Sequence, residues 1–426
     1  MTDGASEASG RSWQEFIDQE TERLAQRPPS LPFGREEYAG RLRRLRAQMS
    51  SDGIDVLVVT APDAMCWLHG YSSRWYRTNS STQLPPTQCT VVHMEQGPVF
   101  MIETGFHEEL VRLTSCVEDF RALPATDLNH EASTDDFVRF LVGELAGEGW
   151  LGGVVGLERW SCLPNPVVAG AIEVGLTSKG CRVVDATDTV RLVRRLKSPA
   201  EIEVMERAQA TCDAGLRALQ RRLRPGMTEL EAWNVYMTGQ IAAGGEPAAI
   251  HETVAVGPPE PMLHALSSRR RIEVGDYFHA DACGAVDHYH ARCTRPFFLG
   301  EPPGELRRLA KIVGGVFDVL VETARAGMPF RDLHRVLREY YRDAGVSESD
   351  FFAGGYELGI SFPPDWVGEF LWSCHDHETD AVIEAGLVTN MESCVFLAMV
   401  DTVVFEDGGA RLLSGLPREI LVVKDS

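Results

Sequence analysis

Apolar residues recur along this chain with two different spacings, and these spacings predict where helices and strands lie. Spacings of three and four residues predict helices at 13–24, 38–49 and 134–146. Short segments rich in valine and other apolar side chains predict strands at 55–60, 89–93, 99–102 and 154–157. We therefore predict that residues 34–190 form an α/β domain, a mixed sheet with helices on its faces.

A second region starts with a helix signal and contains an internal repeat. Residues 198–201, Ser-Pro-Ala-Glu, form a capping box with proline at the first helical position, and Thr228 to Glu231 form a second box that starts the next helix. The segment Arg224-Pro-Gly-Met227 returns as Arg325-Ala-Gly-Met328, each time between two helical stretches. We predict a second domain over 198–426, and we predict that residues 1–33 are an N-terminal extension that is partly disordered.

Composition narrows the class of protein. With 62 acidic and 41 basic side chains, the 426-residue chain has a formal net charge of −21. This excess of negative charge disfavours nucleic acid and anionic membranes as partners. The ten cysteines include no Cys-x-x-Cys pair, which predicts free thiols in a reducing compartment. Because the first residues show no targeting pattern, we expect a cytoplasmic protein that acts on a small molecule.

The densest cluster of titratable side chains lies in residues 264–297. Two strands, 277–285 and 288–299, are predicted here as a hairpin-like pair, so four histidines and two carboxylates lie on or beside adjacent strands. His264 precedes Asp281 by 17 residues and is the candidate general base. An alternative is that these side chains only cover the solvated face of a sheet.

The cluster resembles the central motif of a known superfamily. His264, Gly275-Asp276, Asp281, Gly284, Tyr289 and Thr294-Arg295 are similar to the motif of the pita-bread proteins, which include Xaa-Pro aminopeptidases, prolidase, creatinase and ectoine hydrolase. The resemblance implies a duplicated α+β fold for 198–426, which the internal repeat fits. Tyr289-His290 with Arg295 is most similar to the creatinase and ectoine hydrolase branch.

The metal ligands of the superfamily are only partly present. Metal-dependent members hold two metal ions with two aspartates, one histidine and two glutamates. Asp281 and Glu392 match two of these positions, but the other three are occupied by Arg292, Tyr356 and Val400. We therefore reject a metallopeptidase site and predict no metal and no cofactor. A different, mononuclear site remains open, built from His279, His288 or His290 with Asp281.

The resemblance to creatinase implies how a metal-free site is built. His264 is expected to act as acid and base, Asp281 and Glu392 to hold a cationic or amidine group, and Arg292 to bind a substrate carboxylate. Tyr356 is expected to orient substrate or stabilise an oxyanion. The candidate catalytic residues are His264, Asp281, His290, Tyr356 and Glu392.

Two further segments supply candidate binding residues. Residues 355–369 are similar to a segment of ectoine-hydrolase-like proteins, in which two prolines hold the backbone rigidly. The loop around residues 74–77 has two arginines beside aromatic rings, and creatinase implies a homodimer in which such a loop completes the partner's active site. The candidate substrate-binding residues are Arg74, Trp75, Arg77, Arg292, Asp365, Trp366 and Glu369.

The interpretation that follows is a metal-independent hydrolase of specialised metabolism. It would cleave a C–N bond in a small guanidino, amidine or cyclic amidine carboxylic acid, with His264 as general base and acid. Alternatives are a lyase that removes a carbon-bound proton, a catalytically inactive binding protein, and a metal-dependent Xaa-Pro peptidase, which the missing ligands disfavour.

Overall fold

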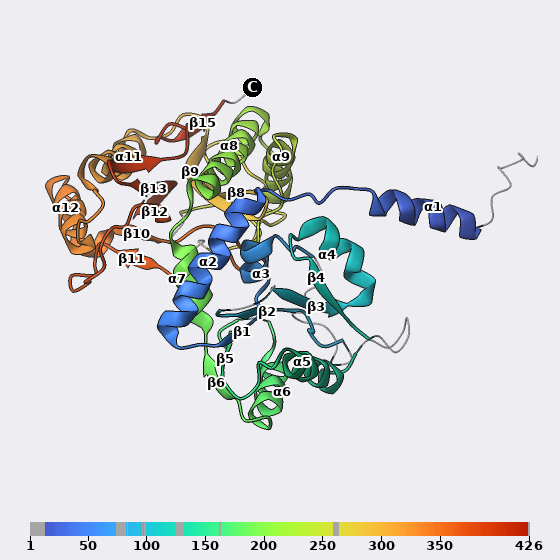
Figure 1. Ribbon diagram of the computed structural model, residues 1–426. Helices are drawn as coiled ribbons and strands as arrows, with labels where there is room; N and C mark the ends of the chain where they lie inside the picture. The colour runs from blue at the N-terminus through green and yellow to red at the C-terminus, as the bar shows by residue number, and fades with distance from the viewer. Residues whose placement is uncertain are drawn as a thin grey trace, which may run out of the picture. The chain divides into compact units, whose positions relative to one another are not determined.

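The structure is a computed structural model that describes residues 13–73, 82, 84–95, 97, 99–124, 132–161, 163–258 and 264–424. The chain divides into two compact units, Met1–Val190 and Arg191–Ser426, whose elements are labelled in Figure 1. Among the described residues, no helix is both long enough and apolar enough to cross a bilayer.

The N-terminal unit contains a six-stranded mixed sheet with the strand order β4-β3-β2-β1-β5-β6. Its central strand β1 pairs antiparallel with β2 and parallel with β5. The predicted α/β sheet is confirmed, but the two edge strands β4 and β6 were not predicted because charged residues interrupt their apolar pattern. The strands are β1 (Val56–Val59), β2 (Cys89–His93), β3 (Phe100–Thr104), β4 (Asp119–Leu123), β5 (Val154–Leu157) and β6 (Arg182–Asp185).

Helices cover both faces of this sheet. Helix α5 starts with a capping box between Ser133 and Asp136, and its apolar face packs with that of α6 against the strands. Figure 1 shows α5 and α6 on one side of the sheet and α2 and α3 on the other. The helices are α1 (Trp13–Ala25), α2 (Arg35–Asp52), α3 (Pro62–His69), α4 (Glu108–Thr114, after a 3-10 turn at Gly105–His107), α5 (Thr134–Glu148), α6 (Pro166–Thr177) and α7 (Thr187–Arg195).

The C-terminal unit contains a nine-stranded sheet. Seven of its strands follow the order β11-β10-β12-β13-β9-β8-β7, and the other two, β14 and β15, pair with β13 and β9. Strands distant in sequence are therefore neighbours at its centre. The strands are β7 (Thr253–Val256), β8 (Tyr277–Val286), β9 (Tyr289–Leu299), β10 (Phe352–Tyr356), β11 (Leu371–Ser373), β12 (Val388–Val395), β13 (Leu397–Glu406), β14 (Gly409–Leu412) and β15 (Leu421–Val423).

Strands β8 and β9 form the predicted hairpin. Asp287 and His288 make its two-residue turn with positive φ angles of 50° and 65°, as the tight turns of twisted hairpins require. The Glu246 carboxylate accepts hydrogen bonds from both backbone N–H groups, at 3.1 and 3.2 Å. This anchored turn holds the register of the two strands that carry most of the candidate site.

Two helices pack on β8 and β9. Helix α8 (Pro199–Arg222) and helix α9 (Glu229–Ala242) both begin with the predicted capping boxes, at Ser198 and Thr228. Helix α8 approaches the sheet so closely that a Cβ atom on Gly284 would lie 1.9 Å from the carbonyl oxygen of Ala208. Glycine is therefore required at this position of the superfamily-like motif.

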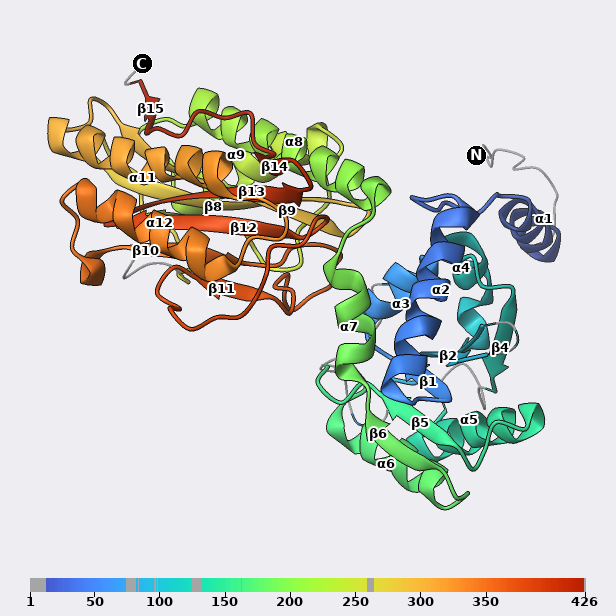
Figure 2. The ribbon, with the colours of Figure 1, turned by 60° about the vertical axis from the view of Figure 1, so that its left-hand side comes forward.

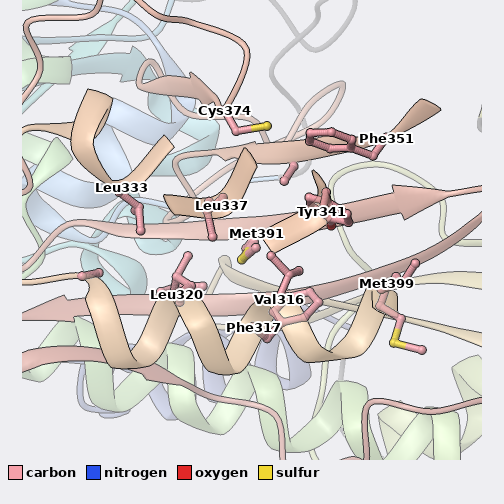
Figure 3. Close-up of a cluster of buried hydrophobic side chains, with 14 of the residues drawn as sticks. Val316, Phe317, Leu320, Leu333, Leu337, Tyr341, Phe351, Cys374, Met391 and Met399 are labelled. Carbon is pink, nitrogen blue, oxygen red and sulfur yellow. The ribbon is translucent and has the colours of Figure 1, made fainter. Parts of the chain in front are cut away.

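The second helix pair packs on the other half of the sheet and repeats the first. Helix α11 (Gly304–Thr323) and helix α12 (Phe330–Asp343) bury Leu320, Leu333 and Leu337 against Met391 of β12, as Figure 3 shows, and a short 3-10 turn follows at Glu348–Asp350. Figure 2 shows both helix pairs beside the strands.

The repeated segments have the same local structure in both halves. Gly226 and Gly327 each have φ of 85°, and their N–H groups donate to the carbonyls of Ile272 and Ile383, both at 2.8 Å. Residues with positive φ favour glycine, which explains why this part of the repeat persists in the sequence. The duplicated α+β architecture is thus confirmed.

Candidate active site

The strand register brings the two predicted carboxylates to one face of the large sheet. Asp281 on β8 is opposite Thr294 on β9, Thr294 is opposite Val400 on β13, and Val400 is opposite Glu392 on β12. Because paired residues on neighbouring strands project from the same face, Asp281 and Glu392 share a face across four strands. They are 111 residues apart in the chain.

Arg292 joins these two carboxylates. Its Nη2 donates to Asp281 Oδ1, and its Nη1 donates to Glu392 Oε1 at 2.8 Å and to the hydroxyl of Tyr356. The backbone N–H of Arg292 donates to Thr402 Oγ1 at 2.8 Å, which fixes the strand beneath the guanidinium. The sequence placed Arg292 at a position for a substrate carboxylate, whereas the structure joins it to carboxylates of the protein.

Neutral side chains orient both carboxylates. Thr294 Oγ1 donates to Asp281 Oδ1 at 2.9 Å, and Asn390 Nδ2 donates to Glu392 Oε1 at 2.9 Å. Asn390 was not among the predicted site residues. It lies two positions before Glu392 on β12, so the two-residue period of a strand is the signal that would have identified it.

Aromatic side chains pack around the guanidinium. The Arg292 Cζ atom lies 5.3 Å from the Trp366 ring centre and 5.6 Å from that of Tyr356, distances typical of cation–π contacts. Trp366 Nε1 donates to the Tyr356 hydroxyl at 3.1 Å. Because that hydroxyl oxygen accepts from both Trp366 and Arg292, its own hydrogen is left to be donated elsewhere.

Arg292, its two carboxylate partners and Tyr356 form the cluster of the candidate site, and its charged groups stabilise one another. Burial opposes the charge on Arg292, but Asp281, Tyr356 and Glu392 raise its pKa well above the ordinary value, so the guanidinium stays cationic. Desolvation raises the pKa of Tyr356, although Arg292 acts in the opposite direction, so its phenol stays protonated. Two carboxylates against one guanidinium leave the cluster with an excess of one negative charge.

His264 lies in an exposed turn. The carbonyl of the next residue, Ala265, accepts from Thr253 Oγ1 at 2.8 Å, and Thr253 is opposite Asp281 on the β7–β8 ladder. The backbone next to His264 is thus one strand away from Asp281. Within the described part of the chain, no hydrogen bond joins the His264 ring to the cluster.

His290 has a ring whose two nitrogens are both used by the backbone. Its Nε2 accepts from the N–H of Ala249 at 2.9 Å, and its Nδ1 lies 2.8 Å from the carbonyl oxygen of His288. Burial lowers the pKa of His290 to about 4, so the ring is neutral near pH 7. This geometry gives His290 the task of holding the chain around 249 and 288.

Of the candidate residues in the rigid loop predicted at 355–369, only some contact the cluster. Trp366 is buried against Arg292, whereas Asp365 Oδ1 accepts from the backbone N–H groups of Trp366 and Val367 at 2.7 and 3.1 Å and so caps its own loop. Glu369 is exposed and pairs with Arg191 at 2.5 Å. The candidates Arg74, Trp75 and Arg77 lie outside the described residues.

A buried ion pair next to this loop had no sequence signal. The Lys197 ammonium contacts the Glu357 carboxylate, and both side chains are almost fully enclosed. Burial lowers the pKa of Lys197, while Glu357 acts to raise it. Because Glu357 also accepts from the N–H of Glu369 at 3.2 Å, the pair anchors the loop that carries Trp366.

The donor set does not fit the pair of metal ions bound by metal-dependent pita-bread proteins. Two of the five ligand positions, Asp281 and Glu392, keep their carboxylates, but the guanidinium of Arg292 lies between them and neutralises part of their charge. Tyr356 and Val400 occupy two other ligand positions. Across the described residues, no group of three or more histidine, cysteine, aspartate and glutamate side chains is arranged to hold a metal ion.

Comparisons with known proteins agree with this architecture. Residues 203–412 match the model of metallopeptidase family M24, and residues 41–196 match that of the creatinase/prolidase N-terminal domain. The chain is 28% identical to the ectoine hydrolase of Halomonas elongata, over 92% of this chain and 99% of the relative. It is 25% identical to the Xaa-Pro dipeptidase of Pyrococcus furiosus, over 55% of this chain and 67% of the relative.

The solved structures show the same fold. The X-Pro aminopeptidase of Thermotoga maritima superposes with a TM-score of 0.70 at 21% sequence identity, over 90% of this chain and 99% of that protein. The ectoine hydrolase and the Xaa-Pro dipeptidase are named for different activities, so similarity to them does not decide the chemistry of this chain. That chemistry has to be inferred from the side chains of the site.

Proposed function

Because the chain belongs to the pita-bread superfamily, with a creatinase/prolidase N-terminal domain and a metallopeptidase family M24 domain, we propose that it is a hydrolase of non-peptide C–N bonds. Its substrate is a small guanidino, amidine or cyclic amidine carboxylic acid, and its mechanism uses no bound metal. The name of the ectoine hydrolase relative is consistent with this class, since ectoine is a cyclic amidine acid.

The observation that carries the proposal is the guanidinium of Arg292 between the two carboxylates. Asp281 uses Oδ1, and Glu392 uses Oε1, to hold Arg292. The second oxygen of each carboxylate makes no hydrogen bond to any described residue, and the two side chains are 17% and 18% exposed. The cluster therefore has two oriented acceptors that solvent or a substrate can reach.

These acceptors match an amidine or guanidine group. Such a group is a planar cation whose N–H bonds point outward in one plane, and it forms charge-assisted hydrogen bonds with carboxylates. The one negative charge in excess on the cluster favours a cationic ligand. A metal ion or a neutral peptide would not use the arrangement in this way, because Arg292 already supplies the local positive charge.

His264 supplies the proton transfers in the proposed reaction. Water loses a proton to an imidazole as its oxygen bonds to the amidine carbon, and the leaving nitrogen takes a proton as the C–N bond breaks. The Tyr356 hydroxyl, which keeps its proton, donates to the group that gains electron density at the carbon. His264 fits this role because an imidazole can both accept and donate a proton.

The substrate carboxylate needs a cationic partner other than the terminal nitrogens of Arg292. We assign this task to Arg74 and Arg77, with Trp75 as a stacking surface, in a homodimer whose loops complete each other's sites. Mixing an inactive His264→Ala protein with an inactive Arg74→Ala/Arg77→Ala protein should restore part of the activity. Absence of any recovery in a mixture shown to exchange subunits would contradict the shared site.

The test of function uses creatine and ectoine as a guanidino acid and a cyclic amidine acid. We expect at least one of them to be hydrolysed after exhaustive chelation, with less than one metal ion per chain by mass spectrometry. Reaction in ¹⁸O-water should place the label in the product, which separates hydrolysis from elimination. His264→Ala should lower kcat by about 10²- to 10⁴-fold, the usual contribution of general acid–base catalysis.

Arg292→Asp is the matched control, since it restores a carboxylate that metal-dependent relatives carry. We expect this variant to bind Mn²⁺ or Zn²⁺ more tightly than the natural protein and to lose amidine hydrolysis. Activity of the natural protein that disappears on chelation and returns with a divalent ion would overturn the metal-free mechanism. Failure to hydrolyse either compound, together with cleavage of a Xaa-Pro dipeptide, would overturn the substrate class.

A further inference from the structure

A second histidine lies next to Asp281 on the same strand. His279 precedes Asp281 by two residues on β8, so the two side chains project from the same face. The residues opposite His279 are Ala255 on β7 and Pro296 on β9, whose side chains offer it no hydrogen bond. His279 is 1% exposed, and it is therefore enclosed beside the cluster.

The hydrogen bonding of His279 leaves one nitrogen bare. Its Nδ1 lies 3.4 Å from the carbonyl oxygen of Gly257, and a carbonyl can only accept, so Nδ1 carries the hydrogen. Its Nε2 is buried and has no hydrogen-bond partner among the described residues. A neutral ring in this tautomer has its lone pair on Nε2, where it can take a proton.

The charges around His279 suit a base. Burial lowers its pKa, which keeps the ring neutral near pH 7. The carboxylate of Asp281 on its own strand, the Gly257 carbonyl and the carboxylate of Glu229 on α9 act in the opposite direction. These acceptors would stabilise an imidazolium once the ring has taken a proton. Arg292 lies on the far side of Asp281 along the strand pair.

A second buried histidine shows what a purely structural ring looks like. His334 on α12 also has Nδ1 near a backbone carbonyl, that of Asp376 at 2.9 Å, and a bare Nε2. Its ring stacks on Trp372 with centroids 5.8 Å apart inside the hydrophobic core of the second helix pair. The two rings have the same polar contacts, but only His279 of this pair shares a strand face with Asp281.

We propose that His279, rather than His264, is the general base of the site and that His264 acts only as the acid. His279 Nε2 takes the proton from water as the water oxygen bonds to the amidine carbon. The C–N bond then breaks, its electron pair stays on nitrogen, and His264 protonates that nitrogen. After the product leaves, water that enters the site carries the proton from His279 to His264, which completes the cycle. This division of labour rests on the proposed hydrolysis.

The first measurement needs no substrate. Long-range ¹H–¹⁵N spectra of the histidine rings, with His279 assigned through His279→Gln, should show Nδ1 protonated and Nε2 unprotonated near pH 7. Asp281→Asn should lower the pKa of His279, because it removes the negative charge beside the ring. A ring protonated on Nε2, or a His279 pKa that does not respond to Asp281→Asn, would overturn the proposal.

The second measurement is a kinetic comparison of matched variants on the compound that the natural protein hydrolyses. His279→Gln should lower kcat by about 10²- to 10⁴-fold with a much smaller change in KM, and it should remove the acidic limb of the pH profile. His334→Gln, the matched buried ring, should leave kcat and the pH profile unchanged. Circular dichroism and thermal unfolding check that each variant folds, and His279→Asn replaces a variant that does not.

The outcomes separate the two proposals. If His264→Ala is inactive while His279→Gln keeps its kcat and acidic limb, the hydrolase stands and the role of His279 is overturned. If the natural protein hydrolyses none of the compounds, the function is overturned, and the tautomer and its response to Asp281→Asn still decide whether His279 offers a free base beside Asp281.

Discussion

Two buried arginines on strand β9 are used in opposite ways. Arg295 is completely enclosed with Asp401, both side chains being 0% exposed. Each of its guanidinium nitrogens has a partner: Nε donates to Pro417 O at 2.8 Å, Nη2 to Asp401 Oδ1 at 2.8 Å, and Nη1 to two further backbone carbonyls. Asp401 Oδ2 makes no hydrogen bond to a described residue, but it is buried out of the reach of solvent.

Arg292 is also buried, yet its partners are not. Asp281 and Glu392 keep one oxygen each free of hydrogen bonds to described residues, and the guanidinium Nε has no partner there either. Asp401 and backbone carbonyls satisfy every nitrogen of Arg295, whereas Arg292 depends on side chains, two of which reach solvent. The difference teaches that a buried charge serves stability when the fold closes around it, and serves binding when its partners stay open.

The largest expected effect is on the free energy of unfolding, at the closed cluster formed by Arg295, Asp401 and the backbone carbonyls around them. Arg295→Met leaves the Asp401 carboxylate buried without its main partner, which should lower the free energy of unfolding by about 3–5 kcal/mol. Arg292→Met should cost clearly less, because Asp281 and Glu392 can be hydrated when the guanidinium is gone. Urea unfolding of both variants checks this. Equal losses would mean that the two clusters are energetically alike.

A second effect depends on pH, because a histidine ring lies near the open cluster, which is Arg292 with Asp281, Glu392 and Tyr356. The His290 ring is 6.5 Å from that of Trp366, and burial lowers its pKa from 6.5 to about 4. A depressed histidine pKa favours the folded state above pH 6.5, and this stability is lost as the pH falls towards 4. The loss should be about 3 kcal/mol.

Unfolding free energies measured between pH 7 and 4 test this expectation. His290→Gln should flatten the pH dependence relative to the natural protein. His69 in the N-terminal unit, whose pKa is lowered to about 3 by burial, remains in both proteins, so the difference between them isolates His290. Identical slopes would show that His290 is solvated in the folded protein.

The smallest expected effect on stability comes from removing the phenol of Tyr356, which belongs to the open cluster. Tyr356→Phe removes the oxygen that accepts from Arg292 and from Trp366 Nε1, which should cost about 1 kcal/mol of stability. If the phenol donates to the reacting group, the variant should lose more in kcat than in stability. Steady-state kinetics beside thermal unfolding measures both, and an unchanged kcat would restrict Tyr356 to a packing role.

Local structure was predictable where neighbouring residues carry the signal. The capping boxes at Ser198 and Thr228, the β8–β9 hairpin and the repeated glycine turns all depend on contacts within a few residues. The edge strand β4 was missed for the same reason, since an edge strand such as Asp119–Leu123 is half solvated and lacks a clear apolar pattern.

The sequence by itself also determined the chemical inventory of the site. The motif around Asp281 and Glu392 identifies the superfamily, and the arginine, tyrosine and valine at positions 292, 356 and 400 differ from the ligands of its metal-dependent members. These conclusions need only residue identity at motif positions. They do not need distances, because a guanidinium cannot become a metal ligand in any conformation.

Only the tertiary structure decided which groups meet. The partners of Arg292 come from β8, β10 and β12, strands whose neighbours are set by the order of the whole sheet rather than by the chain around each residue. The tertiary structure also decided the hydrogen bonding of two histidines that look alike in the sequence. Both ring nitrogens of His290 have backbone partners, whereas Nε2 of His279 has none among the described residues. Burial and hydrogen-bond satisfaction are properties of long-range packing, and they separate an anchored ring from an available base.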